Sequence, residues 1–547
     1  MGQKLESTPV HFTSSECVEN AGVLLLLPFL MSAGLLSYKS HYKELKPGYY
    51  FIDFIILFLS FLYLCRIKNI EQTKQISPGE FGKLLGIDRI PECRCMRYKL
   101  KEIIEQKKSD TWNSELSDSW SVSENNMFYY IDGHIDVYTG YKATLGKKHV
   151  ARQKLCLPGV QEFWVNNMEG LPFFYVTGQV NEKLLETIST QIVPKLLTEI
   201  KPKYSQTELE NDPDLPRFTI IFDREGYSPA FFNKLWNEHR VAVITYRKNV
   251  KDNWSEKDFS MLMVEKDGIK TKMKLTEKQV ELNNFTMREI RKLSDDGHQT
   301  SIITSNKKLD MPEVAKTMFS RWTQENFFKY MRCDYDFDRL MQYVVEQVDS
   351  DLIVANPEYN NLCYYIKKIR EKISRRRAIL QKLIEENVKD ALENTVSQLK
   401  KQAEEKEALD ALLNQEEKLI SDRKKIPSRI KICDMPEHLR YNRLHSESKH
   451  FQNIIKMICY RAETNCANLF ENIYKRFKDE KRVLVKSIIN SHGDIISDYE
   501  KKTLTVCIYS QSNPRMNTAL NELCEILNDA DYCYPSTDLR LIYKIAK

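Results

Sequence analysis

Short apolar segments, rich in β-branched and aromatic residues, recur through residues 128–246 and constrain the fold of this chain more than any other feature. Their lengths favour strands, and two longer amphipathic segments among them favour helices. The expected order is strand 128–131, strand 162–165, strand 173–176, helix 182–199, strand 218–222, helix 229–238 and strand 241–246. A turn at 168–170 predicts antiparallel pairing of the second and third strands, and the later alternation predicts parallel pairing. The sequence therefore predicts an α/β fold with a mixed sheet.

Two apolar stretches lie near the N-terminus, at residues 22–36 and 51–65. Each is shorter than the roughly 20 residues that a membrane-spanning helix needs, and they contain Pro28 and Asp53. The first follows a segment of mixed charge without a short basic region, which argues against a signal peptide. We expect both stretches to be buried helices of a cytoplasmic protein that has no membrane partner.

Residues 76–107 are typical of two helices joined by a turn, of which the second is basic. This pattern is a candidate helix-turn-helix, in which Arg94, Arg97 and Lys99 would meet DNA phosphates or base edges. A polar helix on the surface of a bundle fits the same pattern. Residues 107–126 are rich in Ser, Asp and Asn and predict a linker.

The second half of the chain predicts three further features. Residues 250–298 alternate polar and apolar side chains, which indicates a β insertion, and a helix begins at the N-cap Asp310. Residues 362–425 are charged and lack Gly and Pro, which predicts a long helix or a helical hairpin. This segment would either pair as a coiled coil or present a solvated surface that has no partner. The expected domains are a helical DNA-binding region at 1–120, a catalytic domain at 121–345 with the insertion at about 250–298, a long helical segment at 346–427 and an α+β region at 428–547.

Composition narrows the function. The formal net charge is only +6, so a nucleic-acid-binding surface has to be a local patch. The 13 cysteines have no metal-binding or disulfide spacing, which indicates free thiols in a reducing compartment. The sequence lacks the glycine-rich phosphate loop, the dinucleotide fingerprint, the zinc-protease motif and the serine-esterase motif. Enzymes that depend on those motifs are therefore disfavoured.

Three acidic residues carry the strongest chemical signal. Asp132 and Asp223 each follow an apolar run that predicts a strand. Ligands bind at the carboxyl ends of strands in open α/β sheets, and two carboxylates there suit Mg²⁺. Glu325 shares a predicted helix face with the cations Arg321, Lys329 and Arg332. Taken separately, the two aspartates could simply form turns, and Glu325 could belong to a surface salt-bridge ladder with Arg321 and Lys329. Their combined order favours a two-metal site for phosphoryl transfer on a ribonuclease H-like core.

Three segments carry a family resemblance: YYIDGHIDVYTG around Asp132, RFTIIFDREGYSPAFFNKLW around Asp223 and RWTQENFFKYMR around Glu325. They resemble the conserved blocks of DDE transposases from bacterial insertion sequences, which also carry a β-rich piece before the glutamate helix. That helix resembles the group's tyrosine, arginine, glutamate and lysine signature. Arg321 stands in the arginine place and Arg332 in the lysine place, whereas Met318 stands in the tyrosine place and lacks its hydroxyl.

The resemblance implies a ribonuclease H-like core, dependence on Mg²⁺ or Mn²⁺, and cleavage of element ends followed by attack of the freed 3′ hydroxyl on target DNA. It implies that Asp132, Asp223 and Glu325 are catalytic metal ligands. It also implies phosphate contacts by Arg321, Lys329 and Arg332. The basic run after the first strand predicts further DNA contacts, with a solvated loop as the alternative, and comprises Lys142, Lys147, Lys148 and Arg152.

The expected partners are double-stranded DNA, as terminal inverted repeats and as target, and a second copy of the chain, because two element ends have to be held at once. The expected location is the bacterial nucleoid. Two other functions stay open on the sequence alone. One is a ribonuclease H-like, structure-specific nuclease that cuts without joining, and the other is a non-catalytic DNA-binding or scaffolding protein whose acids are structural.

Overall fold

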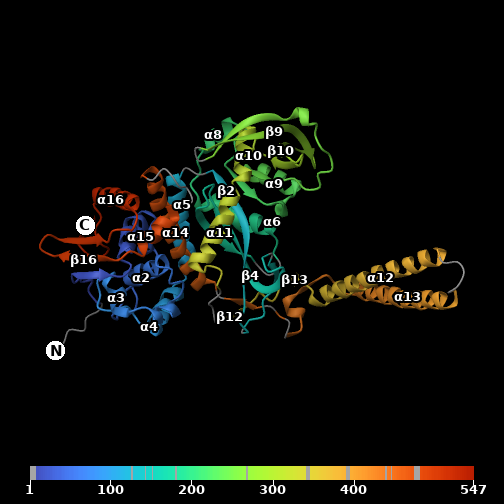
Figure 1. Cartoon of the computed structure of the whole chain (residues 1–547), viewed down its shortest axis with the longest axis horizontal. Coiled ribbons are helices and arrows are strands. Elements are labelled where there is room, and N and C mark those ends of the chain that lie inside the picture. The colour runs from blue at the N-terminus through green and yellow to red at the C-terminus, as the bar shows by residue number, and fades with distance from the viewer. Residues whose placement is uncertain are drawn as a thin grey trace.

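The computed structural model contains helices and large mixed sheets, which confirms the α/β class. Figure 1 shows the large sheet near the middle, the two ends of the chain packed together beside it, and a long helical hairpin that projects away from both. The structure describes residues 8–124, 127–141, 143–150, 152–178, 182–266, 269–339, 345–389, 395–437, 440, 442–444, 446–473 and 481–546.

A ten-stranded sheet forms the centre of the molecule. Its first part contains β2 (Phe128–Val137), β3 (Lys147–Val150), β4 (Leu155–Asn166), β5 (Pro172–Thr177), β6 (Phe218–Phe222) and β7 (Val241–Tyr246). β4 runs antiparallel to both β2 and β5, while β6 runs parallel to β2 and to β7. The strands predicted in 128–246, and the direction of their pairing, are confirmed. β2 and β4 extend beyond their apolar runs because their backbones stay paired with each other.

The predicted β insertion continues this sheet. It contains β8 (Ser260–Lys266), β9 (Ile269–Leu282) and β10 (Phe285–Leu293), and β11 (Gln299–Thr304) follows it directly. These strands pair antiparallel in sequence order, and β11 also pairs antiparallel with β7, so backbone hydrogen bonding runs unbroken from β7 to β8. The insertion therefore shares a sheet with the strands that carry the two aspartates.

The helix predicted from Asp310 is divided into α10 (Met311–Phe319) and α11 (Trp322–Tyr335). The Asp310 carboxylate accepts a hydrogen bond from the backbone N–H of Glu313, which confirms the N-cap. At the break, the Ser320 hydroxyl donates to the carbonyl of Lys316, and this local bond competes with the helical ladder. The division sets the direction of α11 independently of α10. Further helices of this part are α6 (Leu184–Thr187), α7 (Val193–Glu199), α8 (Gln206–Asn211) and α9 (Pro229–His239).

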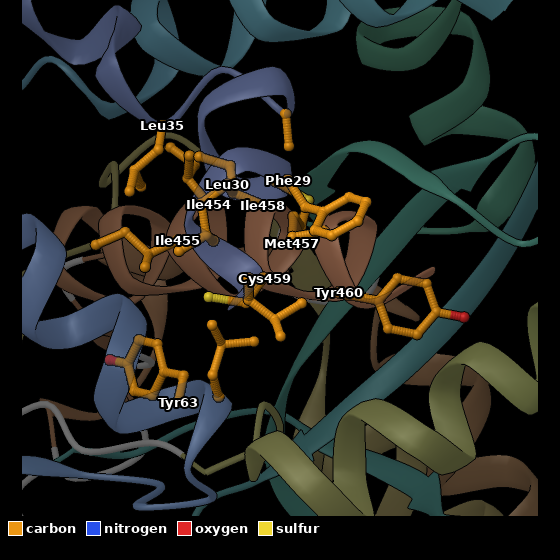
Figure 2. Packing of buried hydrophobic residues seen from close by; sticks show 14 of the residues in the cluster. Phe29, Leu30, Leu35, Tyr63, Ile454, Ile455, Met457, Ile458, Cys459 and Tyr460 are labelled. Atoms are coloured by element: carbon orange, nitrogen blue, oxygen red, sulfur yellow. The ribbon is translucent and has the colours of Figure 1, made fainter. Parts of the chain in front are cut away.

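The two ends of the chain share one hydrophobic core. The strands β1 (Ser15–Val18), β16 (Gly493–Asp498), β17 (Thr503–Ile508) and β18 (Arg540–Ile545) form a four-stranded sheet in that order. Figure 2 shows Leu30 and Tyr63 packed around Ile458 and its neighbours. The helices of this part are α1 (Leu27–Ser32), α2 (Ile52–Leu64), α14 (Glu447–Ile473), α15 (Lys481–Ile489) and α16 (Pro514–Asp529). The predicted burial of the two N-terminal apolar stretches is confirmed, and no helix among the described residues is long and apolar enough to cross a membrane.

Residues 107–126, predicted as a linker, contain the helix α5 (Ser109–Glu124). Trp112, Leu116 and Trp120 recur every four residues and are buried on one face. The Asn113 amide and the Ser117 hydroxyl both donate to the carbonyl of Phe173. The linker prediction is therefore wrong. The polar side chains of this segment form hydrogen bonds to the edge strand β5, and because they are so numerous, the periodic spacing of the three apolar residues was overlooked.

The candidate helix-turn-helix consists of α3 (Pro78–Lys83) and α4 (Cys93–Glu105). Residues 84–92 separate them, whereas a helix-turn-helix uses a turn of roughly three or four residues. The spacing therefore differs from that motif.

The segment 362–425 belongs to a helical hairpin, which was one of its two predicted forms. α12 (Pro357–Lys389) packs against α13 (Thr395–Lys425) through a seam around Ile369, Ile373 and Leu409. The base of the hairpin is closed by pairing of β13 (Ile353–Ala355) with β14 (Arg429–Lys431). Nearby, β12 (Val345–Gln347) pairs with β15 (Asn442–Leu444).

Gly22 marks the closest approach between the N-terminal and C-terminal segments. A Cβ atom at this position would lie 1.7 Å from the backbone oxygen of Ile488. We expect Gly22→Ala to lower the free energy of unfolding by about 3 kcal/mol, because a backbone atom cannot rotate out of the way. Urea denaturation measures the loss. Gly79→Ala is the control, since its Cβ would meet nothing closer than 3.6 Å, and an equal loss in both variants would contradict the close approach.

Candidate active site

Asp132 and Asp223 lie side by side in the sheet. The last residues that pair between the parallel strands β2 and β6 are Ile131 and Phe222. Each aspartate follows directly, so both carboxylates stand at the edge where this pairing ends. The sequence predicted that Asp132 ends its strand, and this detail is wrong, because β2 continues to Val137 along β4.

Arg321 connects the two aspartates to the helix that carries Glu325. Its guanidinium nitrogens lie 3.4 Å from a carboxylate oxygen of Asp223 and 3.7 Å from one of Asp132. Glu325 stands in the first turn of α11 and is exposed. The three predicted acids and their predicted arginine are therefore brought into one neighbourhood.

The electrostatics of the cluster show how closely its members interact. Burial raises the pKa of Asp132 to about 6. Arg321 and the backbone N–H of Gly133 oppose this rise, whereas Asp223 and Glu325 add to it. Arg321 therefore lies close to the carboxylates of Asp132 and Asp223, and the charge of Glu325 also acts on Asp132. Among the described residues, no group of three or more His, Cys, Asp or Glu side chains has an arrangement that could hold a metal ion.

A cavity of about 640 Å³ opens beside the two aspartates. Both aspartates line it, together with three predicted phosphate contacts: Lys148, Arg152 and Arg332. Burial lowers the pKa of Lys148, so its ammonium is favoured less than in water. Lys147 and Lys329 are exposed on β3 and α11, and Lys142 lies outside the described residues. The cavity thus brings carboxylates and cations together at one surface.

The three predicted DNA contacts on α4 are not among the residues that line this cavity. Arg94 is exposed. Arg97 forms an ion pair with Glu71, and Lys99 is buried, where its ammonium donates to the carbonyl of Lys46 at 2.9 Å. Lys99 is therefore committed to an internal contact.

Gln324, next to Glu325, fixes α11 to the sheet and was missed by the sequence analysis. Its side chain is buried, and its amide nitrogen lies 3.1 Å from the carbonyl of Tyr130 and 2.8 Å from the side-chain oxygen of Asn166. The sequence could have indicated this role, because Gln324 is a polar residue on the same helix face as the apolar residues Phe327 and Phe328. This anchor determines where the first turn of α11, and hence Glu325, stands.

A buried ionic cluster lies behind the site and was also missed. The ammonium of Lys449 on α14 contacts Asp136 on β2 and Glu162 on β4, the latter at 2.6 Å. Asp136 is fully buried, and burial, with the charge of Glu162, raises its pKa to about 7. His134 lies 3.6 Å from Asp136 and 3.7 Å from Asp338. The cluster connects the C-terminal region to the strand that bears Asp132.

Comparison with known proteins identifies a family for the chain. No curated protein matches the chain. A family model described as transposase protein matches residues 1–547, which is the whole length of the sequence. The chain therefore belongs to this family of transposases, enzymes that cut and transfer DNA.

Proposed function

We propose that this transposase is of the DDE type found in bacterial insertion sequences, and that it cuts element ends and joins the 3′ hydroxyl to target DNA by two-metal-ion phosphoryl transfer. The observation that carries the proposal is the placement of Asp132 and Asp223 against Arg321, beside a cavity that cations also line, with Glu325 near enough for its charge to act on Asp132. These acids come from two parallel strands and a helix more than a hundred residues further on, so no local turn or cap explains all three.

The strand order supports a ribonuclease H-like core. The relevant part of the sheet has the order β5-β4-β2-β6-β7. In chain order this is 3-2-1-4-5, with the second strand antiparallel and the last two parallel to the first. This is the arrangement of ribonuclease H-like sheets, with the first acid on the central strand and the second after its parallel neighbour.

The chemistry of the donors fits Mg²⁺ or Mn²⁺. Carboxylate oxygens are hard ligands of the kind that these ions prefer. Burial raises the pKa of Asp132, and a bound cation would favour its ionised form. Asp132, Asp223 and Glu325 would hold the ions. When bound, such ions activate the attacking oxygen and stabilise the leaving oxygen.

The other side chains of the site would hold the DNA. Lys148, Arg152 and Arg332 face the cavity and supply positive charge for a backbone phosphate. Arg321 would hold Asp132 and Asp223 at the strand edge, and Gln324 would orient the start of α11. Met318 is buried in a hydrophobic cluster that also contains Tyr130 and Ile221, and as a methionine it supplies no hydroxyl in the place of the signature tyrosine.

We further propose that the DNA partners are the terminal inverted repeats and the target, and that two copies of the chain act together on a pair of ends in the bacterial nucleoid. The support is chemical: one cluster of acids serves one strand end at a time, whereas transposition requires two ends.

A joining assay tests the proposal. The protein is incubated with labelled DNA that carries the element's terminal repeats, and with a target plasmid, in Mg²⁺, in Mn²⁺ or in EDTA. We expect joined products in either metal and none in EDTA. Cleavage without joining would favour the structure-specific nuclease, and binding without cleavage in both metals would favour the scaffolding protein.

A further inference from the structure

The net positive charge of the chain is concentrated on one helix. α12 has nine Lys or Arg residues and four Asp or Glu residues, an excess of five positive charges, whereas the whole chain has a formal charge of +6. Its partner α13 has seven of each sign. The hairpin therefore carries a basic helix and a neutral one.

The cations of α12 divide into two groups. Arg370 and Arg376 form ion pairs with Glu416 and Glu405 of α13 and tie the two helices together. The other cations from 367 to 382 are exposed and form no ion pair with any described residue: Lys367, Lys368, Lys372, Arg375, Arg377 and Lys382. Lys368 lies over the ring of Tyr364, 4.7 Å from its centre. Six like charges without an ion-pair partner add little to the stability of the helix, because neighbouring like charges repel.

The apolar residues of the hairpin are largely used inside it. Ile369 and Ile373 are buried in the seam with Leu409 of α13. The base is held by β13 and β14, where the backbone N–H of Asn356 donates to the carbonyl of Ser428 at 3.0 Å. Figure 1 shows the two helices projecting from the body of the protein. The hairpin α12–α13, which we call the arm, is therefore held together by its own seam and base strands, and the cations of its basic helix α12 are exposed to solvent.

We infer that α12 is a DNA-binding arm, which lies along the phosphate backbone of duplex DNA outside the catalytic cavity and has no preference for base sequence. The 33 residues of α12 span about 50 Å, and duplex DNA carries one negative charge per roughly 1.7 Å of its axis. Long, flexible Lys and Arg side chains suit phosphates. Near the base, Tyr364 and Tyr365 are half exposed and offer hydroxyl donors to the same backbone.

The positive charge of α12 favours DNA over a second copy of the chain as the partner that binds it. Pairing of two α12 helices would bring their unpaired cations together, and the apolar seam such pairing needs already faces α13. DNA supplies the opposite charge over the full length of the helix. The inference depends on membership of the transposase family and not on the proposed metal chemistry.

Binding of a random-sequence duplex of about 30 base pairs to the full chain tests the arm, without divalent ions so that catalysis plays no part. The arm variant combines Lys368→Gln, Lys372→Gln, Arg375→Gln and Lys382→Gln, which share one face of α12 and keep good helix formers. The control combines Lys400→Gln, Lys401→Gln, Lys406→Gln and Lys418→Gln on α13. Circular dichroism verifies that both variants are folded.

We expect the arm variant to bind at least ten-fold more weakly at 150 mM salt and the control to bind within two-fold of the original chain. The slope of log affinity against log salt concentration should fall by about three to four in the arm variant, because each lost phosphate contact removes about 0.9. Unchanged affinity and slope in the arm variant, or an equal loss in the control, would overturn the inference. So would a change in oligomeric state, or loss of binding to anionic lipid vesicles, while DNA binding stays intact.

Discussion

Asp132→Asn is expected to abolish DNA cleavage and joining while it stabilises the folded protein above pH 6. The folded-state pKa of Asp132, about 6, lies above its ordinary value of 3.8, so the folded protein binds this proton more tightly than the unfolded chain does. The folded protein therefore loses stability as Asp132 ionises. This loss begins near pH 4 and is complete above pH 6. The shift corresponds to about 3 kcal/mol, and because 29% of the side chain is exposed, we expect a gain of about 1–2 kcal/mol at pH 8.

Urea denaturation at pH 8 and pH 4, together with the joining assay in Mg²⁺, measures both effects. At pH 4 the asparagine should give little advantage, since Asp132 is then protonated in the folded protein. Glu225→Gln is the matched control, because Glu225 is exposed and lines the same cavity without belonging to the three acids. Its activity and stability should stay unchanged. Retained joining by Asp132→Asn, or lower stability at pH 8, would contradict the assignment.

The position of the two aspartates could be predicted because it depends on local patterns. The short, β-branched and aromatic run 218–222 favours a strand, and parallel neighbours bring their carboxyl ends to one edge. Helical spacing placed Arg321 and Glu325 on one face of a continuous helix, whereas the structure divides that helix and leaves Arg321 just before α11. Periodicity in a single sequence is sufficient for features of this kind.

The supporting contacts could not be predicted because they join residues far apart in the chain. The polar sequence of α5 gave no indication that Asn113 and Ser117 bond to the carbonyl of Phe173. Lys99 was expected at a surface, yet it is buried against the carbonyl of Lys46. The burial of a charged side chain cannot be read from the sequence around it, because it depends on helices and strands that pack against it only in the folded protein.

The pairing of the chain's ends illustrates the same limit. β1, near the N-terminus, pairs with β16, more than 470 residues later. The sequence showed two separate regions, at 1–120 and 428–547, because each contains helices of ordinary length. Their shared core depends on shape complementarity around residues such as Gly22, and hydrophobic pattern alone does not contain that information.

Lys449→Met is expected to lower the free energy of unfolding by about 3–5 kcal/mol, since it leaves two buried carboxylates without a cation. Although burial lowers the pKa of Lys449, Asp136 and Glu162 outweigh it, so the net pKa is raised and the ammonium is retained. The pKa of Asp136 is about 7 even with Lys449 present, and it rises further without it. The folded variant therefore regains stability as the pH falls through 7, and the loss should be larger at pH 8 than at pH 5.

Two comparisons separate this electrostatic cause from a simple loss of packing. Lys456→Met removes another buried lysine of α14, whose pKa is lowered to about 8 by burial. Its ammonium donates to the backbone carbonyl of Asp336 and lies 5.2 Å from the ring centre of Tyr63, without an ion pair to a described carboxylate, so we expect a loss of only about 1 kcal/mol. Combining Lys449→Met with Asp136→Asn and Glu162→Gln should restore most of the lost stability, because no uncompensated charge is then buried. Urea denaturation at both pH values decides the matter. An equal loss in both lysine variants, or a loss that does not depend on pH, would mean that Lys449 acts by filling space. A pH-dependent loss would mean that α14 holds β2 through charge, so that the C-terminal region positions the strand that carries Asp132.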